Sequence, residues 1–201
     1  MSPGLREKKQ AQIRAAIFRA ALALFEEKGF DAASVDEIAD RAQVSRATYF
    51  NYFGTKEGVL RYYGEQLAAH LAASAGAAGR GRGPLEIMRG VLEAWASYTA
   101  AHRDEAATVY RYSLRGPDCP LRLTSARQGV LELFERLAGA GQAAGQIRSD
   151  LPAGHVALFV LSVFQSALGL YVAGDGVPLE SSLEMAWTFI TGGIGHAGRQ
   201  A

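Results

Sequence analysis

Residues 34–56 read SVDEIADRAQVSRATYFNYFGTK, and this stretch predicts two short helices joined by a tight turn. Ser34 followed three residues later by Glu37 is a capping box, so the first helix should begin at Val35. A small residue on its apolar face would let a second helix approach closely. The apolar residues of that face are Val35, Ile38, Ala39 and Ala42.

The second helix should follow a turn at Gln43 and Val44 and begin after a second capping residue, Ser45. It spans Arg46 to Phe53. Two helices joined in this way form a helix-turn-helix, whose second helix lies in the DNA major groove. The apolar residues that would hold it against the first helix are Ala47, Tyr49, Phe50 and Phe53.

The polar side of the second helix carries side chains that suit DNA. Arg46 can bond guanine with two hydrogen bonds, and Asn51 can do the same with adenine. Thr48, Tyr52 and Lys56 suit phosphate oxygens, which fix the register of a protein on DNA without reading its sequence. Many helical hairpins are amphipathic in the same way, so this pattern alone does not establish DNA binding.

The order of residues over 44–60, V-S-x-A-T-x-F-x-Y-F-x-x-K-E-x-x-L, resembles the signature of the tetracycline-repressor (TetR) family of transcriptional regulators. The upstream run AIFRAALALFEEKGF at 16–30 is similar to the first helix of that family. The resemblance covers roughly 13–60; the remainder is similar only in helical character and length. Phe50 stands where the family usually has a tyrosine whose hydroxyl contacts a phosphate, and Phe50 cannot make that bond.

The resemblance implies a homodimeric repressor that binds a palindromic DNA operator and is released by a small-molecule effector. It implies a DNA-binding domain over 1–56 and a ligand-binding and dimerisation domain over 57–201. The residues expected to contact DNA are Arg14, Ser34, Ser45, Arg46, Ala47, Thr48, Asn51, Tyr52 and Lys56.

The composition is that of an ordinary globular protein, with 49% hydrophobic and 20% charged residues and a net charge of +1. The single cysteine, Cys119, allows no intrachain disulfide, which fits a reducing cytoplasm. The most apolar run, 156–172, is shorter than the roughly 20 residues that span a bilayer. We therefore expect it to be buried in protein, with no membrane partner.

Helical periodicity continues through the chain, and the expected fold class is all-α: a three-helix head on a larger helical bundle. A polar arm, 1–9, and a glycine-rich loop, 76–84, should lie outside helices. A capping box at Ser181 and Glu184 suits the last helix, although Pro178 permits an earlier start. The other expected helices span 10–28, 56–73, 85–102, 104–115, 121–144 and 153–173.

Aromatic side chains in the second part of the chain suit a small-molecule pocket, because tyrosine places a polar tip in apolar surroundings. Any one of them alone is better explained by core filling, and Arg111 and Arg115 are either anion partners or solvated charges. The residues expected to line the pocket are Trp95, Tyr98, Val109, Tyr112, Phe134 and Phe164. The last two helices should form the homodimer, because 156–172 needs an apolar cover.

Other functions find little support. The motif Gly193-x-Gly195-x-x-Gly198 follows no strand and precedes no helix, so it does not indicate a dinucleotide cofactor. The four histidines lack metal-ligand spacing, and no catalytic motif is present, so we expect no metal, no cofactor and no enzyme activity. The alternatives left open are a helical interaction module whose head does not bind DNA and, less favoured, a helical enzyme.

Overall fold

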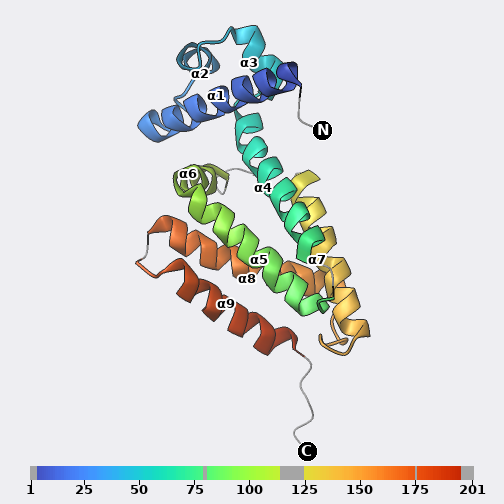
Figure 1. Ribbon diagram of the computed structural model, residues 1–201. Helices are drawn as coiled ribbons and strands as arrows, with labels where there is room; N and C mark the ends of the chain where they lie inside the picture. The colour runs from blue at the N-terminus through green and yellow to red at the C-terminus, as the bar shows by residue number, and fades with distance from the viewer. Residues whose placement is uncertain (1–3, 79–80, 114–124, 175, 196–201) are drawn as a thin grey trace, which may run out of the picture.

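The computed structural model describes residues 4–78, 81–113, 125–174 and 176–195. The described residues contain nine α-helices and no named strand, so the expected all-α fold is confirmed (Figure 1). The helices are α1 (Leu5–Lys28), α2 (Val35–Arg41), α3 (Arg46–Phe53), α4 (Lys56–Ala78), α5 (Pro84–Ala101), α6 (Arg103–Ser113), α7 (Ser125–Ala143), α8 (Ala153–Ala173) and α9 (Leu179–Ile194).

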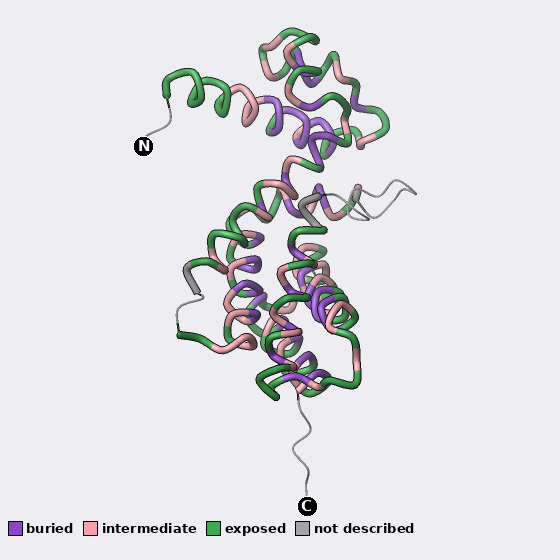
Figure 2. The backbone as a smooth tube through the Cα atoms, turned by 90° about the vertical axis from the view of Figure 1, so that its right-hand side faces the viewer, coloured by how far each residue is buried: buried purple, intermediate pink, exposed green. Residues whose placement is uncertain are grey.

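Helices α1, α2 and α3 form a head, and α4 runs from this head into a body made by α5 to α9 (Figure 1). In the body, α8 packs between α7 and α9, while α6 lies at the end nearest the head. Burial follows this arrangement, because the buried residues lie on the inward sides of the helices (Figure 2). One buried core thus runs from the head into the body, and α4 contributes to it in both parts.

The helix-turn-helix forms as its capping residues predict. The Ser34 hydroxyl accepts a bond from the Glu37 amide (3.2 Å), and the Glu37 carboxylate accepts one from the Ser34 amide (2.9 Å). Ser45 caps α3 by accepting a bond from the Thr48 amide (3.1 Å). Gln43 takes a left-handed conformation (φ 56°) between the helices, which turns the chain sharply.

Two helix ends differ from expectation. α1 begins at Leu5, so the predicted arm is mostly helical; residues 5–9 are good helix formers, and the Gly4 amide bonds the Glu7 carboxylate (2.9 Å). α4 continues to Ala78 through part of the predicted glycine-rich loop, because the run around Gly76 is rich in alanine.

The last helix starts at Leu179, directly after Pro178, so the capping box predicted at Ser181 is wrong. Leu179 and Ser182 are buried and fix this first turn against the body. Residues 114–124, which include Arg115, Cys119 and the start of the helix expected at 121–144, lie outside the described residues.

α8 is the one helix in the described part of the chain that is long and apolar enough to cross a membrane, judged by length and composition alone. About a third (33%) of that stretch is buried. The core helices of many proteins pass the same test. Its coverage is less complete than expected, because Leu158, Phe159 and Leu170 reach the surface while the opposite side is buried.

Lys56, the first residue of α4, holds the loop between α1 and α2. Its ammonium donates to the carbonyl oxygens of Phe30 (2.8 Å) and Asp31 (3.2 Å) and lies 4.8 Å from the centre of the Phe30 ring. α1 and α2 are also joined by ion pairs between Lys28 and Glu37 and between Arg41 and Glu27. Charged side chains around the core of the head therefore hold α1, α2 and the start of α4 together.

Replacing Lys56 by methionine should destabilise the protein, because the carbonyl oxygens of Phe30 and Asp31 lose a charged donor while an apolar side chain of similar length is kept. We expect the free energy of unfolding to fall by about 1–2 kcal/mol in urea titrations. Lys9→Met, at an exposed position of α1, is the matched control and should change little. Equal stability of Lys56→Met and Lys9→Met would contradict this role.

Glu37 should make the stability of the head fall in acid. Hydrogen bonds from Lys28, and then from Ser34, lower the pKa of this carboxyl from 4.5 to about 2. A pKa lowered in the folded state gives stabilisation that is complete above about 4.5 and is lost as the pH falls towards about 2. Glu37→Gln should therefore flatten the curve of unfolding free energy against pH in this window.

Glu26→Gln, on the exposed side of α1, serves as the control for Glu37 and should keep the wild-type curve. Urea unfolding at each pH measures both variants. If Glu37→Gln also kept the wild-type curve, the Glu37 carboxylate, with its bonds to Lys28 and Ser34, would not be the source of acid sensitivity.

Candidate nucleic-acid interface

One side of α3 is fixed to the head by two aromatic side chains. Tyr49 is fully buried and its hydroxyl donates to the Thr55 carbonyl (3.0 Å), while Phe53 is 3% exposed. Burial, with a smaller effect of the Glu57 charge, raises the pKa of Tyr49 to about 12, so its hydroxyl keeps its proton. These two contacts decide which residues of α3 face outward.

Ala47 and Phe50 do not help to hold α3, contrary to expectation. Ala47 is exposed, and Phe50 is 42% exposed. The reason is helical geometry: with Tyr49 and Phe53 inward, four residues apart, the positions two residues before and one residue after Tyr49 turn away from the core. Phe50 is therefore a surface side chain on the same helix as the predicted base contacts.

The predicted contact residues of α3 form an outward row. Arg46 and Asn51 are exposed, Ser45 is exposed at the cap, and Thr48 and Tyr52 are half-buried at the edge of the row. The Ser45 and Thr48 hydroxyl groups lie 2.8 Å apart and bond one another. The row is thus available to a partner, with Thr48 already engaged by its neighbour.

Arg46 is held by an acid of the preceding helix. One guanidinium nitrogen lies 2.6 Å from each carboxylate oxygen of Asp36, and the guanidinium carbon lies 5.5 Å from the centre of the Phe50 ring. Both partners of this ion pair are more than half exposed, so it is weak and readily exchanged. No pattern in the sequence distinguishes Asp36 as the partner of Arg46.

Three other predicted contact residues are engaged within the protein. Ser34 serves the capping box, and Lys56 bonds the α1–α2 loop. Arg14 is half-buried, pairs with Glu65 (3.3 Å) and lies 4.3 Å from the centre of the Tyr62 ring. The structure therefore brings Ser45, Arg46, Ala47, Asn51 and the half-buried Thr48 and Tyr52 together on one surface, and it ties Arg14 to α4.

The expected ligand-pocket residues are not all neighbours. Trp95, Val109, Phe134 and Phe164 are buried in the body core, and the rings of Trp95 and Phe164 are 5.4 Å apart. Tyr98 is half-buried and stacks on His102 at 4.2 Å.

Tyr112 lies at the joint between body and head. Its hydroxyl donates to the Phe25 carbonyl of α1 (2.9 Å), and its ring lies 5.8 Å from that of Phe30. The sequence cannot separate this joint residue from the core aromatic residues, because all of them fall at helical spacing.

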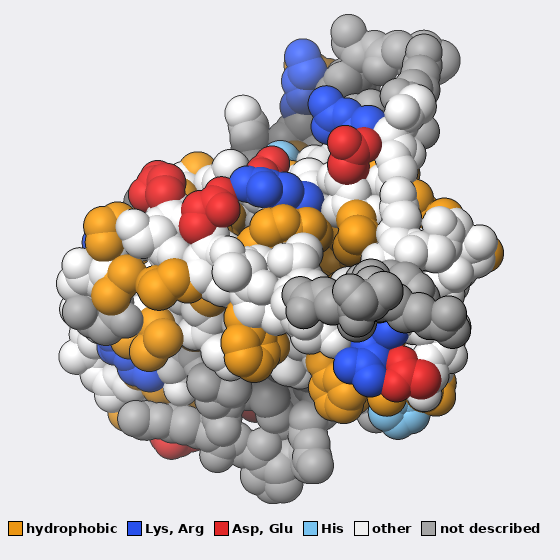
Figure 3. All heavy atoms as spheres, turned by 90° about the horizontal axis from the view of Figure 1, so that it is seen from below, with side chains coloured by type: hydrophobic (Ala, Val, Ile, Leu, Met, Phe, Trp, Pro, Cys, Tyr) orange, Lys and Arg blue, Asp and Glu red, His pale blue; other side chains and the backbone are white. Residues whose placement is uncertain are grey.

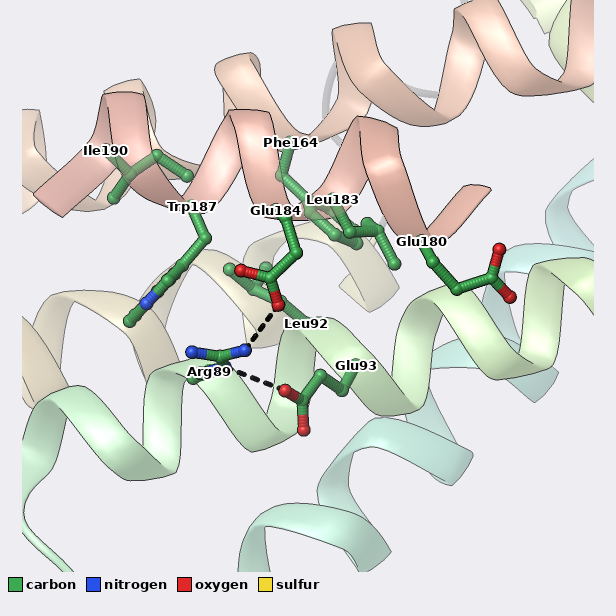
Figure 4. A pocket seen from close by; sticks show the side chains of 9 residues that line it. All are labelled: Arg89, Leu92, Glu93, Phe164, Glu180, Leu183, Glu184, Trp187 and Ile190. Carbon is green, nitrogen blue, oxygen red and sulfur yellow. Dashed lines mark hydrogen bonds and ion pairs between the residues drawn. The ribbon is translucent and has the colours of Figure 1, made fainter. Parts of the chain in front are cut away.

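A cleft of about 200 Å³ opens between α5, α8 and α9 (Figure 4). Its floor is apolar, and Phe164 is the one predicted pocket residue that lines it. Arg89 bonds Glu93 (2.8 Å) and Glu184 (2.6 Å) across the rim, beside Trp187. The rim also carries Glu180, so the cleft has an acidic edge.

Two further clefts lie elsewhere in the body. One of about 300 Å³ sits on the outer side of α8 and α9, next to Phe159 and Phe189, and one of about 360 Å³ lies between α4 and α7. Hydrophobic side chains also interrupt the polar surface of the body at the end away from the head (Figure 3). The large exposed hydrophobic residues of α8 and α9 are Leu158 (40%), Phe159 (50%), Leu170 (55%), Met185 (60%) and Phe189 (71%).

Comparisons with known proteins support the assignment of the head as a helix-turn-helix domain of transcriptional regulators. The family described as "Bacterial regulatory proteins, tetR family" matches residues 17–63. The chain is 32% identical over 92 residues to the HTH-type transcriptional regulator TcmR of Streptomyces glaucescens, covering 46% of this chain. The matched part spans 41% of TcmR, so this likeness extends over less than half of that regulator.

Whole-chain similarity comes from solved structures. FadR of Thermus thermophilus, described as a TetR-family transcriptional repressor in complex with lauroyl-CoA, is 31% identical with a TM-score of 0.70. The match covers 94% of this chain and 97% of that one. FadR of Bacillus subtilis, in complex with stearoyl-CoA, shares the fold with a TM-score of 0.75 at 21% identity, covering 90% and 98% of the two chains. The chain therefore belongs to the TetR family of transcriptional regulators.

Proposed function

We propose that the chain is a cytoplasmic repressor that binds a palindromic operator as a homodimer and is released by a small molecule. In this proposal residues 1–56 read DNA, and 57–201 bind the effector and form the dimer. The observation that carries the proposal is the outward row of α3, held in place by the buried Tyr49 and Phe53.

Base reading is assigned to the exposed residues of α3. Arg46 and Asn51 have the donors and acceptors for guanine and adenine, while Ala47 and the exposed Phe50 suit a thymine methyl group. Ser45 and Tyr52 have hydroxyl groups for phosphate. Arg46 must exchange Asp36 for its base, which costs little because the ion pair is solvated.

The remaining predicted DNA contacts keep supporting roles. Thr48 and Ser34 lie near the start of their helices, where amide groups favour phosphate. Lys56 has one ammonium donor beyond the two that bond carbonyl groups, and Arg14 holds α1 to α4. These four residues would fix the register of the head and leave sequence preference to Arg46 and Asn51.

The homodimer is assigned to α8 and α9, because five large hydrophobic side chains reach the surface there. A second copy would cover Phe159 and Phe189 with its own equivalent residues, as two-fold symmetry requires. A protein partner explains this surface better than lipid, because the acidic cleft rim with Glu180 and Glu184 borders the same helix. Two heads would then meet major grooves roughly 34–36 Å apart.

The effector is assigned to the body, and α4 links it to the head. A ligand shifts DNA affinity only if it binds one arrangement of the two heads better than the other. Lauroyl-CoA, which the Thermus relative binds, is the first compound to test. α4 contributes to the core in both head and body, so a change at its body end would reach Val59, Leu60 and Tyr62 beside the head.

Arg46 and Asp36 test the DNA-reading surface in opposite directions, measured by gel shift on an operator selected from random duplex DNA. Arg46→Ala should cost about 1–3 kcal/mol and relax base preference at one operator position. Asp36→Asn frees Arg46 and should tighten binding by up to about fivefold.

Asp40→Asn removes the same charge from an exposed position of the same helix, α2. It is the control for the change in net charge alone. Asp36→Asn should therefore exceed Asp40→Asn in its effect. If Arg46→Ala weakened all DNA sequences equally, Arg46 would contact phosphate, and if no variant or wild type bound DNA, the proposal would fail.

Phe189→Glu tests the dimer. The side chain is 71% exposed in one copy, so the charge should leave the single chain folded but oppose burial against a second copy. We expect light scattering to show a monomer and gel shift to show weaker operator binding. Ala100→Glu, on the exposed side of α5, is the control and should remain dimeric. A dimeric Phe189→Glu protein would place the interface elsewhere.

A further inference from the structure

The body core contains three polar side-chain atoms that have no hydrogen-bond partner: Tyr63 Oη, Trp95 Nε1 and Thr99 Oγ1. Their residues are 4%, 7% and 0% exposed, respectively. In the described part of the chain, the one other buried side-chain atom of this kind is Nε of Arg14. Unpartnered buried groups are thus concentrated in one part of the body.

The three groups lie on two neighbouring helices. Trp95 and Thr99 are one turn apart on the buried side of α5, and Tyr63 comes from α4. The Tyr63 ring packs on Tyr98 of α5, with 5.8 Å between ring centres. Burial raises the pKa of Tyr63, and the nearby Thr99 hydroxyl offsets a part of that rise. The two hydroxyl groups are therefore close, although they do not reach hydrogen-bonding geometry.

Thr99 differs from two threonines in other helices, Thr108 of α6 and Thr191 of α9. A helical threonine usually satisfies its hydroxyl by donating to the carbonyl oxygen one turn earlier. Thr108 does so to Asp104 (3.1 Å), and Thr191 does so to Trp187 (2.9 Å). Thr99 leaves this bond unmade, although a buried polar group without a partner costs free energy. Its hydroxyl is free to bond something that enters the core.

The surroundings favour an uncharged guest. The pKa values of Tyr63 and Tyr98 are both raised, first by burial, because these surroundings disfavour a charge. The titratable neighbours include His70 and His102, whose rings lie 5.2 and 4.2 Å from that of Tyr98, and Tyr62, Tyr110 and Glu105. The unpartnered groups themselves are neutral donors, and the wall beside them is aromatic.

We propose that Tyr63 and Thr99 bind an uncharged hydrogen-bond acceptor, such as a carbonyl oxygen, on an apolar aromatic effector, with Trp95 as a further donor. This inference rests on the proposed function, in which the body takes a small molecule. Because Tyr63 belongs to α4, a guest bonded to both helices fixes α4 against α5 and so restricts the helix that leads to the head. Regulation would pass through this bridge.

The first test needs no ligand. Thr99→Val and Tyr63→Phe keep the shape of the core and remove the unpartnered hydroxyl, so each should raise the thermal midpoint by about 2–6 °C. Thr108→Val removes a hydroxyl that has a partner, and its midpoint should stay level or fall. A fall in the midpoint of Thr99→Val to match that control would show that its hydroxyl already has a partner, which overturns the proposal.

The second test uses three probes of one shape: acetylnaphthalene, ethylnaphthalene and naphthoate. By calorimetry, the ketone should bind wild-type protein about tenfold more tightly than the hydrocarbon, with the carboxylate weakest. Thr99→Val combined with Tyr63→Phe should lose the preference for the ketone. Equal binding of ketone and hydrocarbon, absence of binding by all three, or a preference that survives in the double variant overturns the proposal.

Operator gel shifts on the same samples separate this inference from the proposed function. The double variant should bind operator like wild type but should not respond to the ketone. If wild type binds no operator while the ketone preference holds, the proposed function fails and the site chemistry stands. If wild type binds operator and shows no ketone preference, the inference fails alone.

Discussion

The rest of the head depends on the packing of the Tyr49 and Phe53 rings into its core. An eight-residue helix is too short to be stable alone, so α3 exists because these rings enter the core beside Ile38 and Ala39. The Tyr49 hydroxyl also bonds the Thr55 carbonyl, which ties the end of α3 to the start of α4. With one side of α3 fixed so firmly, the opposite side must face solvent, and that side carries Arg46, Ala47 and Asn51.

The same constraint reaches the body through α4. Arg14 and Tyr112 join the head to the remainder from two sides: Arg14 pairs with Glu65 of α4, and Tyr112 of α6 bonds the Phe25 carbonyl of α1. Both bonds are partly buried, and the Tyr112 ring also packs against Phe25 and Phe30. The proposed regulation of the head would require these contacts to rearrange.

Local signals in the sequence predicted the helix-turn-helix well. Capping by Ser34, Glu37 and Ser45 depends on residues three apart, so it can be read without knowing the fold. Contacts between distant residues could not be read in this way. The bonds of Lys56 to the carbonyl groups of Phe30 and Asp31, 26 and 25 residues earlier, are one example. The pairing of Arg46 with Asp36 is another, because it depends on how α2 and α3 cross.

The aromatic residues of the body show the same limit. Tyr112 and Trp95 both fall at helical spacing among apolar residues. Tyr112 nevertheless lies where the head meets the body, whereas Trp95 lies in the core of the body. The unpartnered hydroxyl of Thr99 leaves no trace in the sequence at all, because a threonine in a helix normally bonds its own backbone.

The most direct test of the central claim is the distance between the two recognition helices on DNA. Spin labels at Glu57→Cys, an exposed position in the first turn of α4 directly after α3, in a Cys119→Ser background, report the separation of the two heads in the operator complex. We expect roughly 34–36 Å between the recognition helices after correction for the position and length of the label, one turn of DNA on a single face. A distance far from one turn, or no coupling between two labelled copies, would contradict it.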